Sequence, residues 1–332
     1  MKIILTYQPA FYKINLYNKL AEKTDILVVF SNVNNNTRNR DFINGEMFFP
    51  HKFLSGSIFK KMLQFTYIVF SQKYDEVILT EWELITPWIV AFVSPKRKNS
   101  AVVESSIIES STTGVKGLLK RIFFSRISKA YASGKSQARL TRQLGMNGSN
   151  IITKGVGVFN YINQPPYVER KRVVNFVFVG RLIWQKNIEF LIRQFNRHPE
   201  LLLHIIGSGV LESDLKSIAN TNIRFVGYVN NTELPDYYQK ADVFVLPSVK
   251  EPWGLVVEEA LNNGTPVMVS ENVGCAEEIV SDSNGVVFKL TDEDFEEKLK
   301  AICNVEKYNQ MRFNISKMDF EKIEAEQINC YL

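Results

Sequence analysis

The sequence predicts an α/β protein built from two doubly wound parallel-sheet domains with a cleft between them. Three observations support this fold class. The length of 332 residues suits about two domains of ordinary size. Short apolar runs alternate with longer, partly periodic stretches through both halves, a pattern typical of parallel strands joined by crossover helices. A segment with two consecutive prolines separates the halves.

In the first half, the stretches Tyr12–Lys23 and Val115–Ile127 are expected to be helices. The polar run Ser31–Asp41 is expected to be an exposed loop. The predicted strands are Ile3–Thr6, Ile26–Phe30, Val77–Thr80, Ala101–Val103 and Ala130–Ser133.

The second half shows the pattern more clearly, because glycine or proline follows most of its apolar runs. One helix is predicted over Ile188–Phe195, and another begins near Gly254 and ends at Gly264, a usual helix-ending residue. The predicted strands are Val174–Val179, Leu201–Ile206, Ile223–Val226, Val243–Leu246 and Pro266–Val269. Ligands of open α/β sheets bind where such strands end. The run Gly207–Gly209 follows one of these strands. A ligand loop and a plain turn are equally good interpretations of it.

The boundary between the halves is placed at about 160–172, because Pro165 and Pro166 exclude helix and favour extended chain. We expect a first domain over 1–164, a second over 165–310 and a helical tail over 311–332. A return of this tail to the first domain is one hypothesis.

Charge divides the chain in the same way. Residues 1–165 hold 22 Lys and Arg against 10 Asp and Glu, a balance of +12, whereas residues 166–332 hold 18 against 25, a balance of −7. The basic half could face an anionic membrane leaflet or an anionic acceptor, or its lysines could simply solvate it. Nucleic acid is not an expected partner, because no nucleic-acid motif is present.

Composition argues against a membrane-spanning or metal-binding protein. No apolar run approaches about 20 residues, and the strand-like start of the chain lacks signal-peptide architecture, so a cytoplasmic location is expected. Cys275, Cys303 and Cys330 lack metal-ligand spacing and are interpreted as free thiols. The acidic run Asp292–Asp294 is interpreted as the capped start of a helix. No metal and no cofactor are therefore predicted.

The segment from Glu251 to Glu259 is the strongest candidate for a ligand site. Gly254 lets a ligand approach the backbone closely, and the first N–H groups of the helix that follows are unpaired and favour anions or polyol oxygens. Leu255 and Glu259 lie one turn apart on the same face. The Glu259 carboxylate is therefore placed to accept hydrogen bonds from vicinal hydroxyls, such as those of a ribose.

Cations are expected beside such a site. Gly180 and Arg181 follow the first strand of the second domain, and Lys186 comes five residues after Arg181. Arginine offers a fork of donors to a diphosphate, and lysine a point charge. Fixed cations stabilise a leaving diphosphate more in the transition state than in the ground state.

These motifs together resemble the family 4 retaining glycosyltransferases of the GT-B fold, which has two Rossmann-like domains. The resemblance is closest over about 174–290. In this segment the sequence is most similar to bacterial members that assemble O-antigen, capsule or exopolysaccharide. It implies a nucleotide-sugar donor, with a UDP-sugar as the commonest choice, and a glycan acceptor that is lipid-linked and bound by the first domain.

The resemblance also implies a role for each matching residue. Arg181 and Lys186 would bind the donor diphosphate beside Gly180, and Glu251 would be the catalytic carboxylate near the transferred sugar. Glu259 would take the ribose hydroxyls. The sugar and the phosphate would contact the segment that contains Pro252, Trp253, Gly254, Leu255 and Val256. The base would contact the backbone at Val229. A core aromatic is the alternative interpretation of Trp253.

The first domain departs from the family pattern. The run Gln8–Lys13 replaces a Gly-Gly loop, and no histidine follows a central strand of this domain. Lys13 and Glu104 are the acceptor-side candidates, although a glutamate such as Glu104 is more often a solvated strand end. An epimerase and a catalytically silent nucleotide-sugar-binding partner remain the alternative functions.

Two stretches suggest docking on the inner face of a membrane. The predicted helix within 116–129 mixes cations with Phe123 and Phe124, and the apolar stretch Phe53–Phe70 contains Lys60 and Lys61. Mixed basic and apolar helices suit an anionic lipid surface. The alternative is a helix that packs one face on its own sheet.

Overall fold

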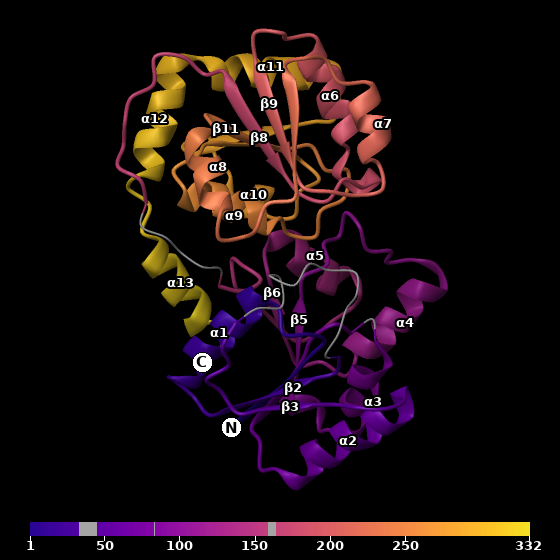
Figure 1. Cartoon of the computed structure of the whole chain (residues 1–332). Coiled ribbons are helices and arrows are strands. Elements are labelled where there is room, and N and C mark those ends of the chain that lie inside the picture. The colour runs from indigo at the N-terminus through magenta and orange to yellow at the C-terminus, as the bar shows by residue number, and fades with distance from the viewer. Residues whose placement is uncertain (33–44, 83, 159–163) are drawn as a thin grey trace. The chain divides into compact units, whose positions relative to one another are not determined.

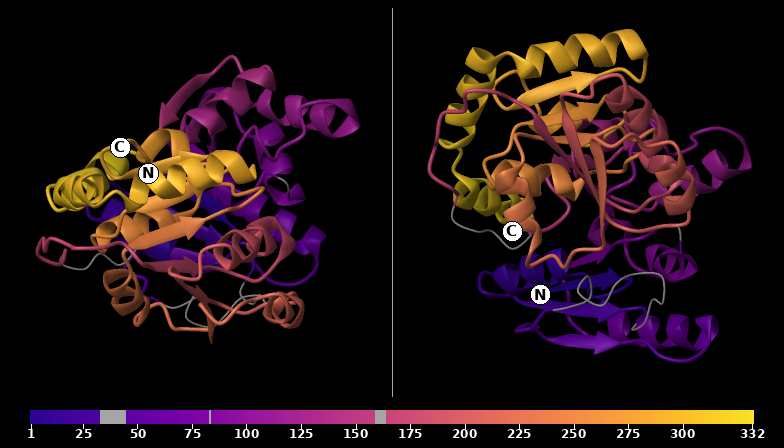
Figure 2. Two further views of the ribbon diagram at one scale, coloured as in Figure 1. Left: turned by 90° about the horizontal axis from the view of Figure 1, so that it is seen from above. Right: turned by 45° about the horizontal axis from the view of Figure 1, so that its top comes forward.

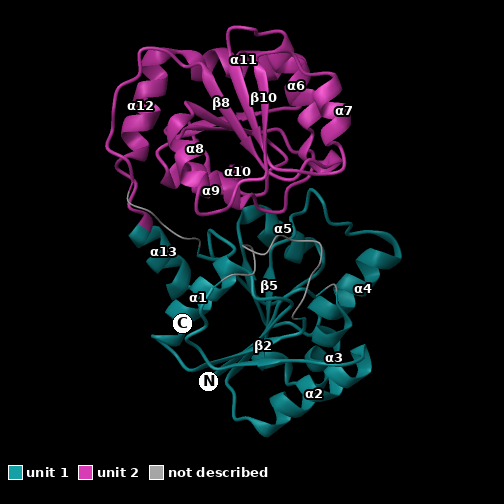
Figure 3. Cartoon of the chain, in the orientation of Figure 1, with its two compact units in different colours: residues 1–160, 321–332 teal, residues 161–320 magenta. Residues whose placement is uncertain are grey.

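The computed structural model describes residues 1–32, 45–82, 84–158 and 164–332. The chain forms two compact units, one of residues 1–160 and 321–332 and the other of residues 161–320 (Figure 3). Each unit holds a parallel sheet with helices packed on it (Figure 1).

The first unit contains a seven-stranded sheet in the order β3-β2-β1-β4-β5-β6-β7. All the neighbouring strands are parallel. The strands are β1 (Lys2–Thr6), β2 (Ile26–Phe30), β3 (His51–Phe53), β4 (Glu76–Leu79), β5 (Asn99–Val103), β6 (Lys129–Ala132) and β7 (Ser149–Ile152). Strand order reverses between β1 and β4, so this is the switch point of the sheet.

Helices cover both faces of this sheet. They are α1 (Phe11–Ala21), α2 (Ile58–Ser71), α3 (Ile85–Val93), α4 (Gly114–Phe124), α5 (Lys135–Gln143) and α13 (Phe320–Asn329), with a 3₁₀ turn η2 (Lys96–Lys98). Apolar side chains of α2 to α5 share one core cluster with the strands, so these four helices lie on the same face. Helices α1 and α13 are ion-paired through Lys19 and Glu324 and lie side by side (Figure 1).

The second unit contains a six-stranded parallel sheet in the order β10-β9-β8-β11-β12-β13. Its strands are β8 (Asn175–Val179), β9 (Leu202–Ile206), β10 (Ile223–Gly227), β11 (Val243–Leu246), β12 (Val267–Ser270) and β13 (Gly285–Phe288). The switch point lies between β8 and β11. This position brings the segments after β8 and after β11 to one edge of the sheet.

Helices of the second unit also pack on both faces of their sheet (Figure 2). They are α6 (Ile188–Asn196), α7 (Glu212–Ser217), α8 (Leu234–Lys240), α9 (Leu255–Asn262), α10 (Ala276–Ile279), α11 (Asp292–Cys303) and α12 (Val305–Ile315), with a 3₁₀ turn η3 (Trp184–Lys186). Asp292–Asp294 forms the first turn of α11, which the Thr291 hydroxyl caps.

Every strand and helix that the sequence predicts is found, with ends that differ by a few residues. Strands β3, β7 and β13 were not predicted. Strand β3 is short and exposed, and β7 is only partly buried, so neither has the apolar run of a buried strand. Most of the predicted loop at Ser31–Asp41 and the start of the predicted linker lie outside the described residues.

The end of the chain differs from the prediction in its boundary. The expected tail begins at 311, but α12 belongs to the second unit, and residues 321–332 belong to the first. The ring of Tyr331 stacks on that of Tyr131 at 4.5 Å between centroids, and both rings are buried. This aromatic contact holds the last residues against β6.

Candidate functional site

Glu251 lies in the loop that follows β11, and the backbone of a neighbouring loop fixes its position. The Gly274 N–H donates to the Glu251 carbonyl at 2.9 Å, and the Glu251 N–H donates to the Asn272 carbonyl at 3.3 Å. The Ser248 hydroxyl donates to the Glu251 carboxylate at 3.4 Å. Glu251 is therefore held at the carboxyl edge of the sheet, as the sequence predicts.

Lys186 forms an ion pair with the Glu251 carboxylate. Lys186 ends the turn η3 after β8, and the Val249 N–H donates to the Gln185 carbonyl at 2.9 Å. This backbone bond ties the loop after β8 to the loop after β11. The structure thus brings together a predicted diphosphate cation and the predicted catalytic carboxylate.

Two glycines complete this edge of the sheet. Gly254 has φ +102°, and an added Cβ would lie 3.5 Å from the Glu251 Cγ and 3.0 Å from a Val273 methyl. At Gly180 an added Cβ would lie 3.6 Å from the Lys186 Cε. Both glycines therefore lie beside the ion pair, where a side chain would approach it.

The Gly207–Gly209 run packs against the backbone after β8. An added Cβ at Gly207 would lie 1.9 Å from the Gly180 carbonyl oxygen, and one at Gly209 would lie 2.4 Å from the Leu182 carbonyl oxygen. The close approach alone requires glycine at both positions. This contact favours the turn interpretation of the run over a ligand loop.

Helix α9 starts at Leu255, directly after Gly254 in the left-handed conformation, and no side chain caps its first N–H groups. Pro252 is exposed and Leu255 and Val256 are partly buried. The unpaired N–H groups of the first turn can therefore donate to an anion or a hydroxyl.

Glu259 lies one helical turn inside α9 and accepts a hydrogen bond from the buried Tyr238 hydroxyl at 2.9 Å. Burial raises the pKa of Glu259, and the Tyr238 hydrogen bond partly offsets this rise. Tyr238 comes from α8 and so fixes the carboxylate from a second element. A carboxylate held in this way is preorganised to accept further hydrogen bonds.

Trp253 is a core residue, as the alternative interpretation holds. Its side chain is buried, and its indole N–H donates to the buried carboxyl of Glu258. Burial raises the pKa of Glu258 to about 8, with the Trp253 hydrogen bond lowering it and nearby Glu259 raising it. Only the backbone of Trp253 remains for a ligand. Glu258 was missed in the sequence, where it is one of two adjacent glutamates.

The remaining donor-side candidates are placed less tightly. Arg181 is exposed at the end of β8. Val229 is buried just beyond β10. The structure brings Lys186, Glu251, Gly180 and Gly254 into contact, and Arg181 and Val229 remain predictions as ligand contacts.

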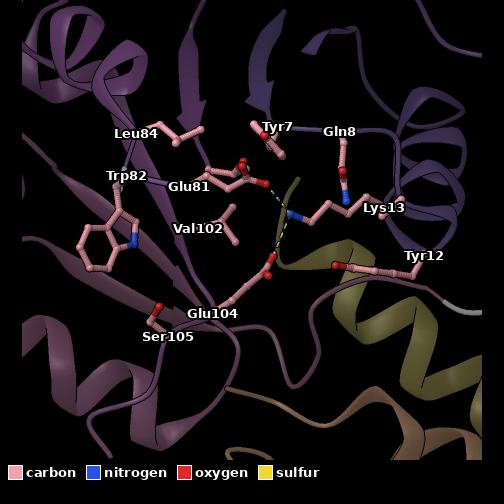
Figure 4. A pocket seen from close by; sticks show the side chains of 12 residues that line it. Tyr7, Gln8, Tyr12, Lys13, Glu81, Trp82, Leu84, Val102, Glu104 and Ser105 are labelled. Carbon is pink, nitrogen blue, oxygen red and sulfur yellow. Dashed lines mark ion pairs between the residues drawn. The ribbon is translucent and has the colours of Figure 1, made fainter. Parts of the chain in front are cut away.

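The acceptor-side candidates Lys13 and Glu104 meet in the first unit (Figure 4). The Lys13 ammonium lies 3.2 Å from a Glu104 carboxylate oxygen and 3.7 Å from one of Glu81. Burial alone would lower the pKa of Lys13, but the neighbouring carboxylates outweigh it, so its pKa lies well above the usual value. Burial raises the pKa of Glu81.

Sequence reasoning missed Glu81. The signal was available, because Glu81 comes just after the predicted strand Val77–Thr80, as Glu104 comes just after Val103. Carboxyl ends of parallel strands meet at one edge of a sheet. The same argument that selected Glu104 would therefore have selected Glu81.

Within the described ranges, no group of three or more His, Cys, Asp or Glu side chains is placed to hold a metal ion. Cys275, Cys303 and Cys330 are free. In the same ranges, no helix is both long enough and apolar enough to cross a membrane.

Residues 163–318 match the family model of the glycosyl transferases group 1. The matched segment is slightly less than half of the chain. It contains β8 to β13 and so every donor-side residue described above. The sequence-based expectation of a glycosyltransferase pattern in this half is confirmed at that level.

Two curated relatives each align with part of the chain. The O-antigen biosynthesis glycosyltransferase WbnH of Escherichia coli is 31% identical over 188 residues, 55% of this chain and 53% of that protein. The uncharacterized glycosyltransferase MJ1607 of Methanocaldococcus jannaschii is 42% identical over 119 residues, 33% of this chain and 30% of that protein. The chain thus matches at most about half the length of these relatives.

Solved structures match nearly the whole chain in fold. Anabaena HepE, solved in complex with UDP and glucose, has a TM-score of 0.70 at 15% identity and covers 98% of this chain and 97% of its own. At this identity the likeness shows the fold alone. The predicted α/β fold class, two Rossmann-like parallel-sheet domains of the GT-B type, is confirmed.

Proposed function

We propose that this chain is a retaining glycosyltransferase that uses a nucleotide-diphosphate sugar. The observation that supports it most is the Lys186–Glu251 ion pair, which lies beside the uncapped start of α9 with Glu259 one turn further on. Cations and a helix start suit a diphosphate. Glu251 then serves the transferred sugar, and Glu259 the ribose. Lys186, Arg181 and the helix start neutralise the diphosphate without a metal ion.

The donor that we propose is a UDP-sugar. Supporting this choice, the group 1 region matches over 163–318, and HepE shares the fold and was solved with UDP and glucose. Backbone near Val229 would meet the base. The proposed pathway is the assembly of a bacterial surface polysaccharide, which the likeness to WbnH, an O-antigen biosynthesis enzyme, supports.

A nucleotide panel tests the donor. The purified chain is melted with UDP, GDP, ADP and the corresponding sugars, since a true ligand raises the melting temperature as its concentration exceeds its dissociation constant. The active donor is then followed for nucleotide release in wild type and Glu251→Gln, and the anomeric configuration of the product is read by NMR. An inverted product would contradict retention. Absence of any nucleotide response would overturn the proposal.

The same assay separates the two alternatives. An epimerase would convert the donor into an isomeric nucleotide-sugar in the absence of an acceptor. A silent binding partner would show the thermal shift but no nucleotide release above the Glu251→Gln background.

We also propose that the acceptor is lipid-linked and that α2 and α4 dock on an anionic lipid surface. Helix α2 exposes Ile58, Phe59, Leu63, Tyr67 and Phe70, and α4 exposes Val115, Leu118, Leu119 and Ile122. The two helices contain four lysines and one arginine and no acidic residue. Apolar side chains flanked by cations suit insertion into an anionic interface.

This surface differs from the predicted one in its residues. Phe123 and Phe124 of α4 are buried in the core of the first unit, where they contact Trp82. The aromatic side chains open to lipid come instead from α2. Aliphatic residues provide the exposed apolar face of α4.

Liposome co-sedimentation tests the docking surface. We expect binding to vesicles with anionic lipid at low salt, and little to purely zwitterionic ones. Phe59→Ser with Tyr67→Ser should reduce binding, whereas Val210→Ser, at a residue of the second unit that is 87% exposed, should not. Equal sedimentation of the α2 variant and wild type would reject this surface.

A further inference from the structure

The first unit contains a cavity of about 320 Å³ at the carboxyl ends of β1, β4 and β5 (Figure 4). It lies where strand order reverses between β1 and β4. Ligands of doubly wound sheets bind in the crevice at such a switch point, and the volume is in the range of small-molecule sites. All of the lining residues belong to the first unit.

Two buried polar atoms in the lining lack hydrogen bonds. Among the described residues, the side-chain oxygen of Gln8 and the hydroxyl of Thr80 have no partner. Gln8 is 7% exposed and Thr80 is 2% exposed, and both line the cavity. Buried polar atoms in proteins are nearly always hydrogen-bonded. The hydrogen bonding of the protein is therefore incomplete beside this cavity.

The charges in the lining come from three side chains, Lys13, Glu81 and Glu104, with a net charge of −1. The carboxylates lie on either side of the single ammonium (Figure 4). Glu81 has φ +52°, a left-handed conformation that is uncommon for a residue with a side chain. Strained residues of this kind concentrate at binding sites, where the surroundings hold them in place.

The uncharged part of the lining is mostly aromatic and aliphatic. Tyr7, Tyr12 and Trp82 border the cavity together with the aliphatic Leu84 and Val102. Apolar and aromatic walls with a few convergent polar groups are typical of small-molecule sites. Carboxylates only accept hydrogen bonds and have several acceptor positions each. This combination suits a pyranose ring, which offers apolar C–H faces and several hydroxyl donors.

We propose that this cavity binds an uncharged pyranose of the acceptor, with Glu81 and Glu104 accepting hydrogen bonds from its hydroxyls. The net negative lining excludes uronates and sugar phosphates, because juxtaposed like charges disfavour the wrong ligand. Lys13 keeps the two carboxylates together. The inference rests on the proposed function and specifies the class of acceptor sugar.

Saturation-transfer NMR on the full chain, without nucleotide, tests this selectivity. The probes are the methyl glycosides of glucose, galactose and mannose, each paired with its uronate. In wild type we expect saturation transfer to a neutral glycoside and none to its uronate. A wild-type response to a uronate equal to that of its neutral partner would overturn the proposal, and so would silence from all of the neutral probes.

Variants with altered lining charge provide the decisive comparison. Glu81→Gln or Glu104→Gln brings the net charge to zero, and the double substitution brings it to +1. We expect the single variants to lose discrimination and the double variant to gain uronate binding. A merely structural role for these glutamates cannot produce such a gain. Unchanged selectivity in the folded single variants would overturn the proposal.

Glu22→Gln is the matched control, since Glu22 is an exposed glutamate at the end of the same helix that contains Lys13. It changes the net charge of the protein but not that of the cavity, so selectivity should stay as in wild type. Thermal shifts with UDP on the same samples separate the two proposals. A normal UDP response without sugar selectivity overturns only this inference, and the loss of both overturns the proposed function as well.

Discussion

Lys186 and Glu251 form an ion pair in which each side chain is only 14% exposed. The lysine comes from the turn after β8 and the glutamate from the loop after β11, at the switch point of the second sheet. The predicted diphosphate cation is therefore paired with the predicted catalytic carboxylate. Under the proposed function, a bound diphosphate would compete with Glu251 for Lys186.

This competition predicts opposite effects at the two positions. Lys186→Met should weaken UDP binding by roughly tenfold or more, because a charge-assisted hydrogen bond contributes about 1.5–3 kcal/mol. Glu251→Gln should bind UDP as tightly as wild type or more tightly, since the competing charge is gone, and yet lose turnover. Isothermal titration calorimetry and nucleotide-release assays measure the two effects. Equal weakening of UDP binding by both substitutions would contradict the competition.

Arg181→Ala should weaken UDP binding as well, by several-fold at low salt and less at high salt, because the side chain is exposed and its charge is screened. Arg193→Ala is the control, because Arg193 is an exposed cation of the same unit, paired 3.3 Å from Glu189 on α6. Titrations with UDP at two salt concentrations measure both. If the two variants behave alike, Arg181 is a surface cation and not a phosphate ligand.

Gly254→Ala should lower both stability and turnover. An alanine at φ +102° is strained by about 1–3 kcal/mol, and its methyl would approach Val273 and Glu251. Gly145→Ala is the comparison, since Gly145 has φ +75° and nothing within 4 Å of an added Cβ. We expect urea unfolding to show a loss of stability in both variants, with turnover reduced only in Gly254→Ala. Full turnover in folded Gly254→Ala would argue against a ligand at the start of α9.

Glu258 should make stability fall as pH rises. Its pKa is about 8 in the folded chain and about 4.3 in an unfolded one. The folded state therefore binds more protons between these values, and its contribution is complete below the lower pKa and lost above the higher one. One such group changes the free energy of unfolding by at most about 1.4 kcal/mol per pH unit.

Glu258→Gln removes this titration and keeps an acceptor for the Trp253 indole. Urea unfolding at pH 6 and pH 9 should show a smaller difference for the variant than for wild type, with the variant the more stable of the two at the higher pH. An identical pH dependence in both proteins would show that Glu258 is ionised in the folded state at neutral pH.

Much of the donor side could be predicted because its signals are local. The strand ends, the helix start after Gly254 and the single turn between Leu255 and Glu259 follow from short-range spacing in the sequence. The side-chain environment of Trp253 could not be predicted in this way. Its partner Glu258 is only five residues away, in α9, but the burial of both side chains depends on how that helix packs on the sheet.

The acceptor side was predictable only in part. Lys13 and Glu104 were candidates, each from its own segment, but nothing local says that they meet or that Glu81 joins them. The order β1-β4-β5 in the sheet brings the three segments together. The return of the last twelve residues to the first unit likewise depends on long-range contacts, such as that of Tyr331 with Tyr131.

The sequence by itself determined the α/β class, the positions of most strands and of several helices, and the candidate residues of the donor side. These features depend on hydrophobic periodicity and on backbone chemistry within about ten residues. The tertiary structure alone decided that Lys186 pairs with Glu251 and that Glu81 and Glu104 share one ammonium. The physical reason is that strand order, and not sequence separation, determines which loops meet at the edge of a parallel sheet.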